Sequence, residues 1–131
     1  MKYKKRYLKE LYKDPIKNFK EIMDVSIYLD SIGEFDFSGQ AISAMEEIEL
    51  VTLSNLLIND LKNRTFDDYN NFGYQAVWWG LLNTDSIEVY ESISKNMNKD
   101  VQYLLNYWLH DVLEPDDLTY VSIKKLFTYL K

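Results

Sequence analysis

Residues 101–113 have the sequence VQYLLNYWLHDVL, and this run shows the clearest secondary-structure pattern in the chain. Apolar side chains recur along it at the i, i+3, i+4 and i+7 positions of a single helix face. These side chains are Val101, Leu104, Leu105, Trp108, Leu109, Val112 and Leu113. Such a stripe is typical of an amphipathic α-helix whose apolar side is buried. We therefore expect this helix to form part of the core.

Helical patterns on both sides of this run extend the prediction over almost the whole chain. We expect further helices at residues 4–12, 15–31, 40–62 with a break near Leu50, 66–82, 85–98 and 117–129. Both prolines suit helix boundaries: Pro15 after Asp14 at a start, and Pro115 at a stop. Because the connections are short, neighbouring helices should be antiparallel. The prediction is a single all-α domain, an antiparallel bundle or short α-solenoid of about six to seven helices.

Caps and glycines refine these boundaries. Ser38 suits an N-cap for the long helix, and Gly33 suits the end of the helix before it. Asp85, with Glu88 three residues later, matches a capping box. Gly73 and Gly80 are poor helix formers, so we expect a neighbouring helix to approach closely there. Of the adjacent Trp78 and Trp79, one should be buried and the other partly exposed.

Residues 85–113 resemble one unit of a HEAT-type helical repeat. The resemblance rests on a helix, a short polar turn, and Asp100 with Val101 opening a second amphipathic helix. The chain departs from that family at Gln102, where a basic residue is usual, and at bulky Leu105 and Trp108, where small residues are common. A short HEAT-like solenoid and a closed bundle therefore both stay open.

Charge is distributed unevenly along the chain. Residues 1–20 have a net charge of +6, residues 21–117 a net charge of −15, and residues 118–131 a net charge of +3. A body this acidic attracts cationic partners and repels nucleic acid and anionic membranes. The chain has no cysteine and no run of about 20 apolar residues. No signal-peptide pattern follows the basic start, so we expect a cytoplasmic protein.

No motif for catalysis, cofactor binding or metal binding stands out. His110 and Glu114 share a helix face, but a catalytic zinc ion normally takes three protein ligands. Residues 34–39 resemble the start of a calcium loop, yet Met45 stands at its twelfth position, where a glutamate is needed. Gly-rich phosphate loops and nucleophile elbows are absent from the sequence. We therefore expect neither an enzyme nor a bound cofactor or metal.

A binding surface is better supported by the pattern. Opposite its leucines, the central helix presents a mixture of tyrosines and acidic groups, which the flanking segments extend. The predicted partner-binding residues are Glu88, Glu91, Tyr103, Tyr107, His110, Asp111, Glu114, Asp116 and Asp117. Tyrosines offer rigid contact area, and carboxylates accept hydrogen bonds from Lys or Arg. The alternative is that the tyrosines pack against a neighbouring helix and the carboxylates are simply solvated.

In size, acidity, Tyr and Trp content and lack of catalytic groups, the chain resembles the immunity proteins that bacteria encode beside secreted polymorphic or contact-dependent toxins. The resemblance implies that it neutralises a basic, nuclease-type toxin domain by covering the active site, with carboxylates in place of phosphates. Two alternatives remain: a helical-repeat adaptor with an apolar groove, or a nucleic-acid-associated protein using the basic N-terminal helix. The sequence leaves the oligomeric state open.

Overall fold

The computed structural model describes residues 9–33, 42 and 44–130, and every regular element in these residues is a helix, as predicted. The elements are α2 (Phe19–Ser31), α4 (Glu47–Leu61), α5 (Phe66–Tyr69), α6 (Phe72–Leu82), α7 (Ile87–Lys95), α8 (Lys99–Tyr107), the π-helical turn η1 (Trp108–Val112) and α9 (Leu118–Phe127). Among the described residues, no helix is both long enough and apolar enough to cross a membrane.

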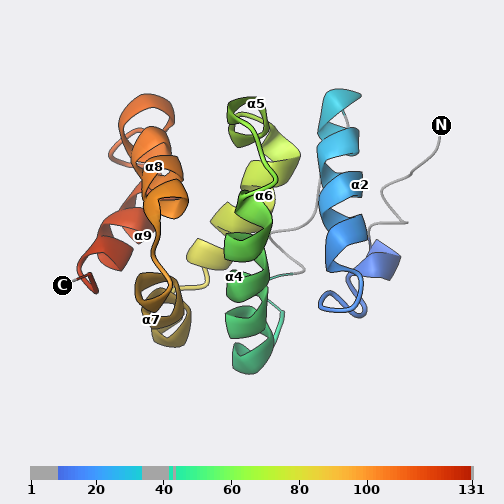
Figure 1. Cartoon of the computed structure of the whole chain (residues 1–131), viewed down its shortest axis with the longest axis horizontal. Coiled ribbons are helices and arrows are strands. Elements are labelled where there is room, and N and C mark those ends of the chain that lie inside the picture. The colour runs from blue at the N-terminus through green and yellow to red at the C-terminus, as the bar shows by residue number, and fades with distance from the viewer. Residues whose placement is uncertain (1–8, 34–41, 43, 131) are drawn as a thin grey trace.

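The helices stand side by side in three groups. Figure 1 shows α2 near the N-terminal end, α4 to α6 in the middle, and α7 to α9 near the C-terminal end. The middle group contacts both others, because α6 packs against α2 and α9, while α4 packs against α7 and α8. Helix α7 also packs against α9. The middle helices therefore carry the buried faces that join the two ends.

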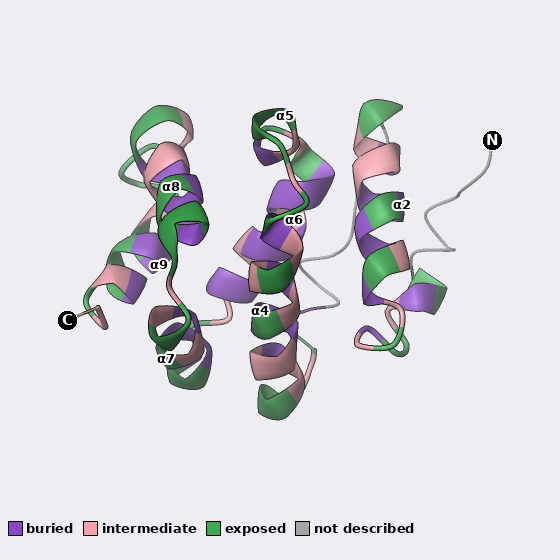
Figure 2. Ribbon diagram, in the orientation of Figure 1, coloured by how far each residue is buried: buried purple, intermediate pink, exposed green. Residues whose placement is uncertain are grey.

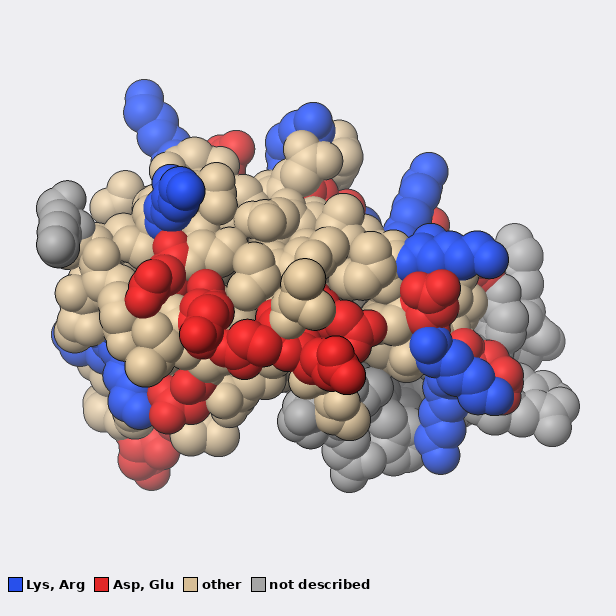
Figure 3. Space-filling model, turned by 90° about the horizontal axis from the view of Figure 1, so that it is seen from below, with Lys and Arg blue, Asp and Glu red and all other residues tan. Residues whose placement is uncertain are grey.

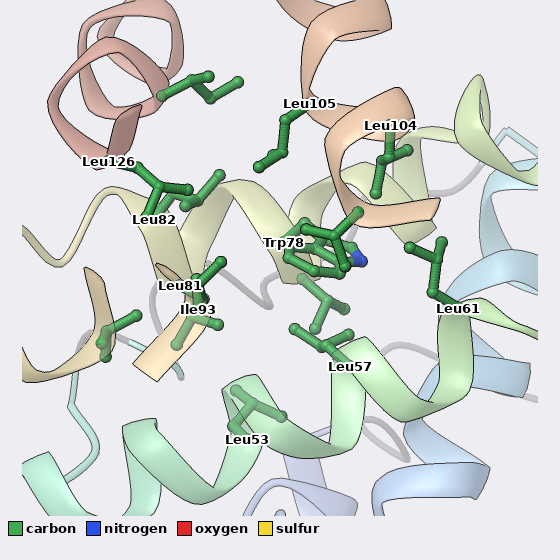
Figure 4. Close-up of a cluster of buried hydrophobic side chains, with 14 of the residues drawn as sticks. Leu53, Leu57, Leu61, Trp78, Leu81, Leu82, Ile93, Leu104, Leu105 and Leu126 are labelled. Carbon is green, nitrogen blue, oxygen red and sulfur yellow. The ribbon is translucent and has the colours of Figure 1, made fainter. Parts of the chain in front are cut away.

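A large apolar core surrounds Trp78 and Trp108, which are both fully buried. Figure 4 shows leucines of α4, α6, α8 and α9 and Ile93 of α7 converging around Trp78. Buried and exposed residues lie on opposite sides of helices such as α7 and α8, whereas the central helix α6 is buried or half-buried at every position after Phe72 (Figure 2). A smaller, separate cluster joins Leu11 to Ile22, Val25 and Leu29 of α2. Trp79 is only partly buried, so the prediction for the tryptophan pair is confirmed.

Gly73 lies where α6 meets α2. A Cβ atom built on Gly73 would stand 1.9 Å from the backbone oxygen of Ser26. No side chain fits in that space, so the predicted close approach is confirmed at this glycine. Gly33 adopts a φ of 77° just after α2, in the left-handed region that ends many helices. Its predicted role at the end of the helix is confirmed as well.

The first two helix starts differ from the prediction. Helix α2 begins at Phe19, because residues 15–18 form turns. Asp14 accepts a hydrogen bond from the Lys17 backbone nitrogen at 3.3 Å, so its side chain supports a turn and no helix start. In the predicted helix at 4–12, residues 9–11 are helical, and residues 4–8 lie outside the described part of the chain.

In the predicted helical region 40–62, Ile42 is helical, residues 44–46 are not, and α4 then begins at Glu47, so the interruption comes before Leu50, which lies inside α4. Glu46 and Glu49 form a reciprocal capping box there, which satisfies amide groups that a helix start leaves without partners. The proposed cap Ser38 lies outside the described residues. The predicted helix at 66–82 is divided into α5 and α6, because the Asn71 side chain accepts a hydrogen bond from Tyr74 and starts α6 anew.

The predicted capping box of Asp85 and Glu88 is wrong. Ser86 caps α7 and accepts a hydrogen bond from the Val89 nitrogen at 3.2 Å. Asp85 instead adopts a φ of 56°, a left-handed conformation that Asp tolerates better than most residues. Asn98, expected to end this helix, is the N-cap of α8. The last helix, α9, starts after Asp117 as predicted and ends at Phe127.

Candidate partner-binding surface

The two tyrosines on the outer face of α8 lie against the short helix α5. The Tyr107 hydroxyl donates a hydrogen bond to Asn70 Oδ1 at 2.7 Å. The Tyr107 ring lies 4.8 Å from the Phe66 ring, centre to centre, and the Tyr103 ring lies 6.3 Å from that of Tyr69. Phe66 is 48% exposed and Tyr103 is 55% exposed. The result is an aromatic cluster across two helices that stays open to solvent.

Trp108 holds this cluster in place from its buried side. Its indole nitrogen donates a hydrogen bond to the Tyr69 carbonyl oxygen at 2.8 Å. Its ring meets Trp78 and Trp79 edge-on, with centres 6.3 Å and 5.7 Å away. Because Trp108 is fully buried, these contacts join the end of α8 to α5 and α6. The exposed aromatic side chains therefore stand on a rigid base.

A π-helical turn continues α8 and changes which residues face the core. The Leu113 nitrogen donates to the Trp108 carbonyl, five residues back, at 2.8 Å. This wider turn departs from the 3.6-residue period, so Val112 and Leu113 are half-buried, whereas the sequence pattern predicted them in the core. His110 and Asp111 are exposed on the same turn. Such turns are frequent at functional sites.

Carboxylates surround the aromatic cluster. Asp67 and Asp68 belong to α5, while Asp100 and Asp111 belong to α8 and η1. Among the described residues, none of the four forms an ion pair. We define the α5–α8 surface as the following seven residues: Phe66, Asp67, Asp68, Asp100, Tyr103, Tyr107 and Asp111.

The electrostatic environment of Tyr69 reflects this arrangement. Burial raises the pKa of its hydroxyl, and the neighbouring Asp100, Tyr103 and Asp68 raise the pKa further. Burial is the larger cause of the raised pKa, and only the smaller contribution of the Asp100 and Asp68 carboxylates reflects a negative potential near Tyr69. The α5–α8 surface therefore combines exposed rings with a field that favours positively charged groups.

Glu88 and Glu91 do not join the tyrosines. Their helix, α7, packs against α4 and α9 at the end of the molecule away from α5 (Figure 1). Ser86, the N-cap of α7, donates a hydrogen bond to Glu47 Oε1 at 2.6 Å. A hydrogen bond between the side chains of Glu47 and Glu88 lowers the pKa of Glu47 and raises the pKa of Glu88. The structure therefore does not place the α7 carboxylates on one face with the α8 tyrosines, the arrangement that would have merged them into one surface.

Acidic side chains nevertheless gather on one face of the molecule. Figure 3, viewed from below, shows Asp and Glu side chains forming a nearly continuous band across this face. The capping carboxylates at the start of α4 and the carboxylates of α7 belong to the same end of the molecule. Of these two acidic regions of the described residues, the α5–α8 surface is the one in which exposed aromatic rings from two helices lie together.

The remaining predicted residues follow η1. Glu114, Asp116 and Asp117 are all exposed, and Asp117 Oδ2 accepts a hydrogen bond from the Glu114 nitrogen at 2.8 Å. Asp117 therefore also organises the turn before α9. His110 and Glu114 are both exposed, and the described residues contain no group of three or more His, Asp or Glu side chains arranged to hold a metal ion.

Four residues of the α5–α8 surface were not predicted as site residues: Phe66, Asp67, Asp68 and Asp100; nor was Asn70, which binds Tyr107. Phe66 stood at the start of a presumed core helix, and Asn70 lies at the break that Asn71 introduces. Recognising the Asn70–Asn71 pair as a helix boundary would have shown this short segment to be a separate element.

Comparison with protein-family models, curated proteins and solved structures found no match for this chain.

Proposed function

We propose that this chain is an immunity protein that binds a basic, nuclease-type bacterial toxin domain and covers its active site. The α5–α8 surface would make the contact. The observation that carries the proposal is the exposure of Phe66 and Tyr103 among carboxylates without ion-pair partners in the described residues. Exposed aromatic groups of this kind often mark interfaces.

The aromatic cluster supports tight binding. Removing apolar surface from water stabilises a complex by about 25 cal/mol per Å². Tyrosine adds a hydroxyl that can bond across the interface, and its few rotatable bonds lose little entropy. Since Trp108 already holds α8 against Tyr69, the surface needs little reorganisation before it binds.

The carboxylates support specificity for a basic partner. A nuclease active site must bind phosphate groups. Its Lys and Arg side chains can donate hydrogen bonds to carboxylates in the same geometry that they use for phosphates. Residues 21–117 carry a net charge of −15, which speeds the encounter with a cationic domain. The same charge disfavours direct binding of nucleic acid.

The test begins with the gene adjacent to the one that encodes this chain. If that gene encodes a secreted protein with a variable C-terminal domain, the domain is purified and its nuclease activity measured with increasing amounts of this chain. We expect inhibition that is complete at one chain per toxin domain. Tyr103→Ala should weaken inhibition, whereas Ile48→Ala, which removes a 73% exposed side chain of α4, should not. Full activity in the presence of excess chain would contradict the proposal, as would binding of generic DNA at low salt.

A further inference from the structure

A groove with a mixed polar and apolar lining lies between α4 and α7 and reaches the start of α8. It has two parts, with volumes of about 830 Å³ and 420 Å³, and Asn55 and Asn96 line both of them. Glu88 and Glu91 line the larger part, and Asp100 lines the smaller part. We call this feature the α4–α7 groove.

Hydrogen bonds fix the orientation of the two shared asparagines. Asn55 Oδ1 accepts from Ser92 Oγ at 3.2 Å and from Asn96 Nδ2 at 3.3 Å. Asn96 Nδ2 also donates to the Ser92 carbonyl oxygen at 2.8 Å. Asn55 Nδ2 and Asn96 Oδ1 then have no partner among the described residues, although both side chains are exposed. The groove therefore presents a free amide donor next to a free amide acceptor.

A donor and an acceptor side by side match the two polar groups of a peptide backbone. An extended chain presents a C=O and an N–H outward at intervals, and asparagine amides can bond to both. Val51 adds an apolar side chain to the lining of the larger part, and Tyr129, whose ring centre lies 5.7 Å from that of Tyr90, adds an aromatic one. These features suit an extended peptide better than a compact small molecule.

The charges favour a basic residue in that peptide. Glu88 and Glu91 line the larger part of the groove, and Glu47 lies beside Glu88. Lys95 lines the same part, but the carboxylates outnumber it; in the smaller part the charges of Lys62 and Asp100 cancel. Tyr129 can cover the stem or the charged head of a lysine or arginine.

We propose that the α4–α7 groove binds an extended peptide segment of a partner protein, with its backbone on Asn55 Nδ2 and Asn96 Oδ1 and a lysine or arginine between Glu88 and Glu91. The inference does not depend on the toxin proposal, because any protein with such a segment would bind. It is tested with synthetic peptides alone, so failure of either proposal leaves the other standing.

The probes are two fluorescein-labelled heptapeptide libraries, one with Lys or Arg fixed at the centre and one with Glu there. Binding to the full chain is measured by fluorescence anisotropy, first with the libraries and then with the best single peptide. We expect saturable binding from the basic library only. The best peptide should lose binding when its central backbone nitrogens are methylated. Equal binding of both libraries, or no saturable binding by either, would overturn the proposal.

Asn55→Asp separates backbone recognition from simple charge attraction. The carboxylate keeps the acceptor for Ser92 and Asn96 but removes the free donor, so we expect about tenfold weaker binding of the basic peptide. If charge alone mattered, the added negative group would strengthen binding, and that result would refute the proposal. Asn63→Asp is the matched control, because Asn63 lines a different pocket and the variant has the same net charge. Circular dichroism confirms that both variants fold.

Discussion

Gly73 sets the distance between α2 and α6. Since a Cβ atom there would lie 1.9 Å from the Ser26 oxygen, one added methyl group must push the two helices apart. Overpacking of a core contact typically costs 1–3 kcal/mol, and backbone is less able to yield than a side chain. We expect Gly73→Ala to lower the free energy of unfolding by about 2–4 kcal/mol, measured by urea denaturation.

Gly33→Ala supplies the comparison for this measurement. Gly33 has a φ of 77°, and no atom lies within 4 Å of the place that the added methyl group would occupy, so the substitution brings conformational strain without a clash. Its cost should be about 1 kcal/mol. Equal losses in the two variants would mean that the close approach at Gly73 contributes nothing of its own.

Asp85 combines an unusual backbone conformation with an ion pair. Lys125 Nζ lies 3.0 Å from Asp85 Oδ1, and this hydrogen bond lowers the pKa of the Asp85 carboxyl. A carboxyl with a lowered pKa in the folded state stabilises the protein above its unfolded pKa of about 4. That contribution is lost as the pH falls through the folded pKa.

Lys125→Met should therefore raise the pKa of Asp85, measured by NMR titration. The stability difference from the parent chain should be small, because both side chains are more than half exposed, and it should shrink with added salt. It should also disappear as the pH falls below the folded pKa of Asp85. Lys124→Met removes the same charge from α9 without this partner. An equal rise of the Asp85 pKa in that control would assign the effect to overall charge.

At the scale of elements, Asn71 decides where α6 begins and how it meets α2. Its Oδ1 accepts from the Tyr74 nitrogen at 3.0 Å, and its Nδ2 donates to the Ile27 carbonyl oxygen at 3.2 Å. Asn71→Asp keeps the cap and loses the contact with α2, whereas Asn71→Ala loses both. We expect losses of about 1 kcal/mol and about 2 kcal/mol in thermal or urea denaturation. An aspartate variant that is no more stable than the alanine variant would disprove the capping role.

Helix α8 shows why the helices themselves were easier to predict than the residues at which helices begin and end. The apolar stripe of α8 predicted Val101, Leu104 and Leu105 as buried, and the structure confirms all three. Boundaries depend on short polar residues that compete as caps, and Asp85 lost to Ser86 because Lys125 and Tyr90 hold its carboxylate elsewhere. The contact with Lys125 joins residues 40 apart in the chain and leaves no local pattern.

At the scale of the whole molecule, the segregation of charge was visible in the sequence but its placement was not. Adjacent helices were expected to share a face, yet α7 packs against α4. The contact uses polar pairs such as Ser54 with Ser92, whose hydroxyl oxygens lie 3.1 Å apart. Polar contacts between helices follow no periodicity. The sequence therefore could not show that α7, which carries Glu88 and Glu91, packs against α4. The tyrosines of the predicted site could be placed on their helix face from the local sequence pattern of α8 alone.

The proposed toxin contact predicts different kinetics for rings and for carboxylates. Tyr103→Ala removes a contact that a partner would bury, so dissociation should become about tenfold faster with little change in association. Asp100→Asn and Asp111→Asn should instead slow association and weaken its salt dependence, because these charges act before contact. Surface plasmon resonance at several salt concentrations measures both rates.

Asp24→Asn on α2 changes the net charge of the chain by the same amount as either carboxylate variant, but at an exposed position that is not part of the α5–α8 surface. If the field of the whole molecule guides the partner, this control should slow association as much as Asp100→Asn does. If the α5–α8 surface guides it, the control should keep the parent rate. We expect the second result, because salt screens charges beyond about 8–10 Å and only carboxylates beside the contact act over shorter distances.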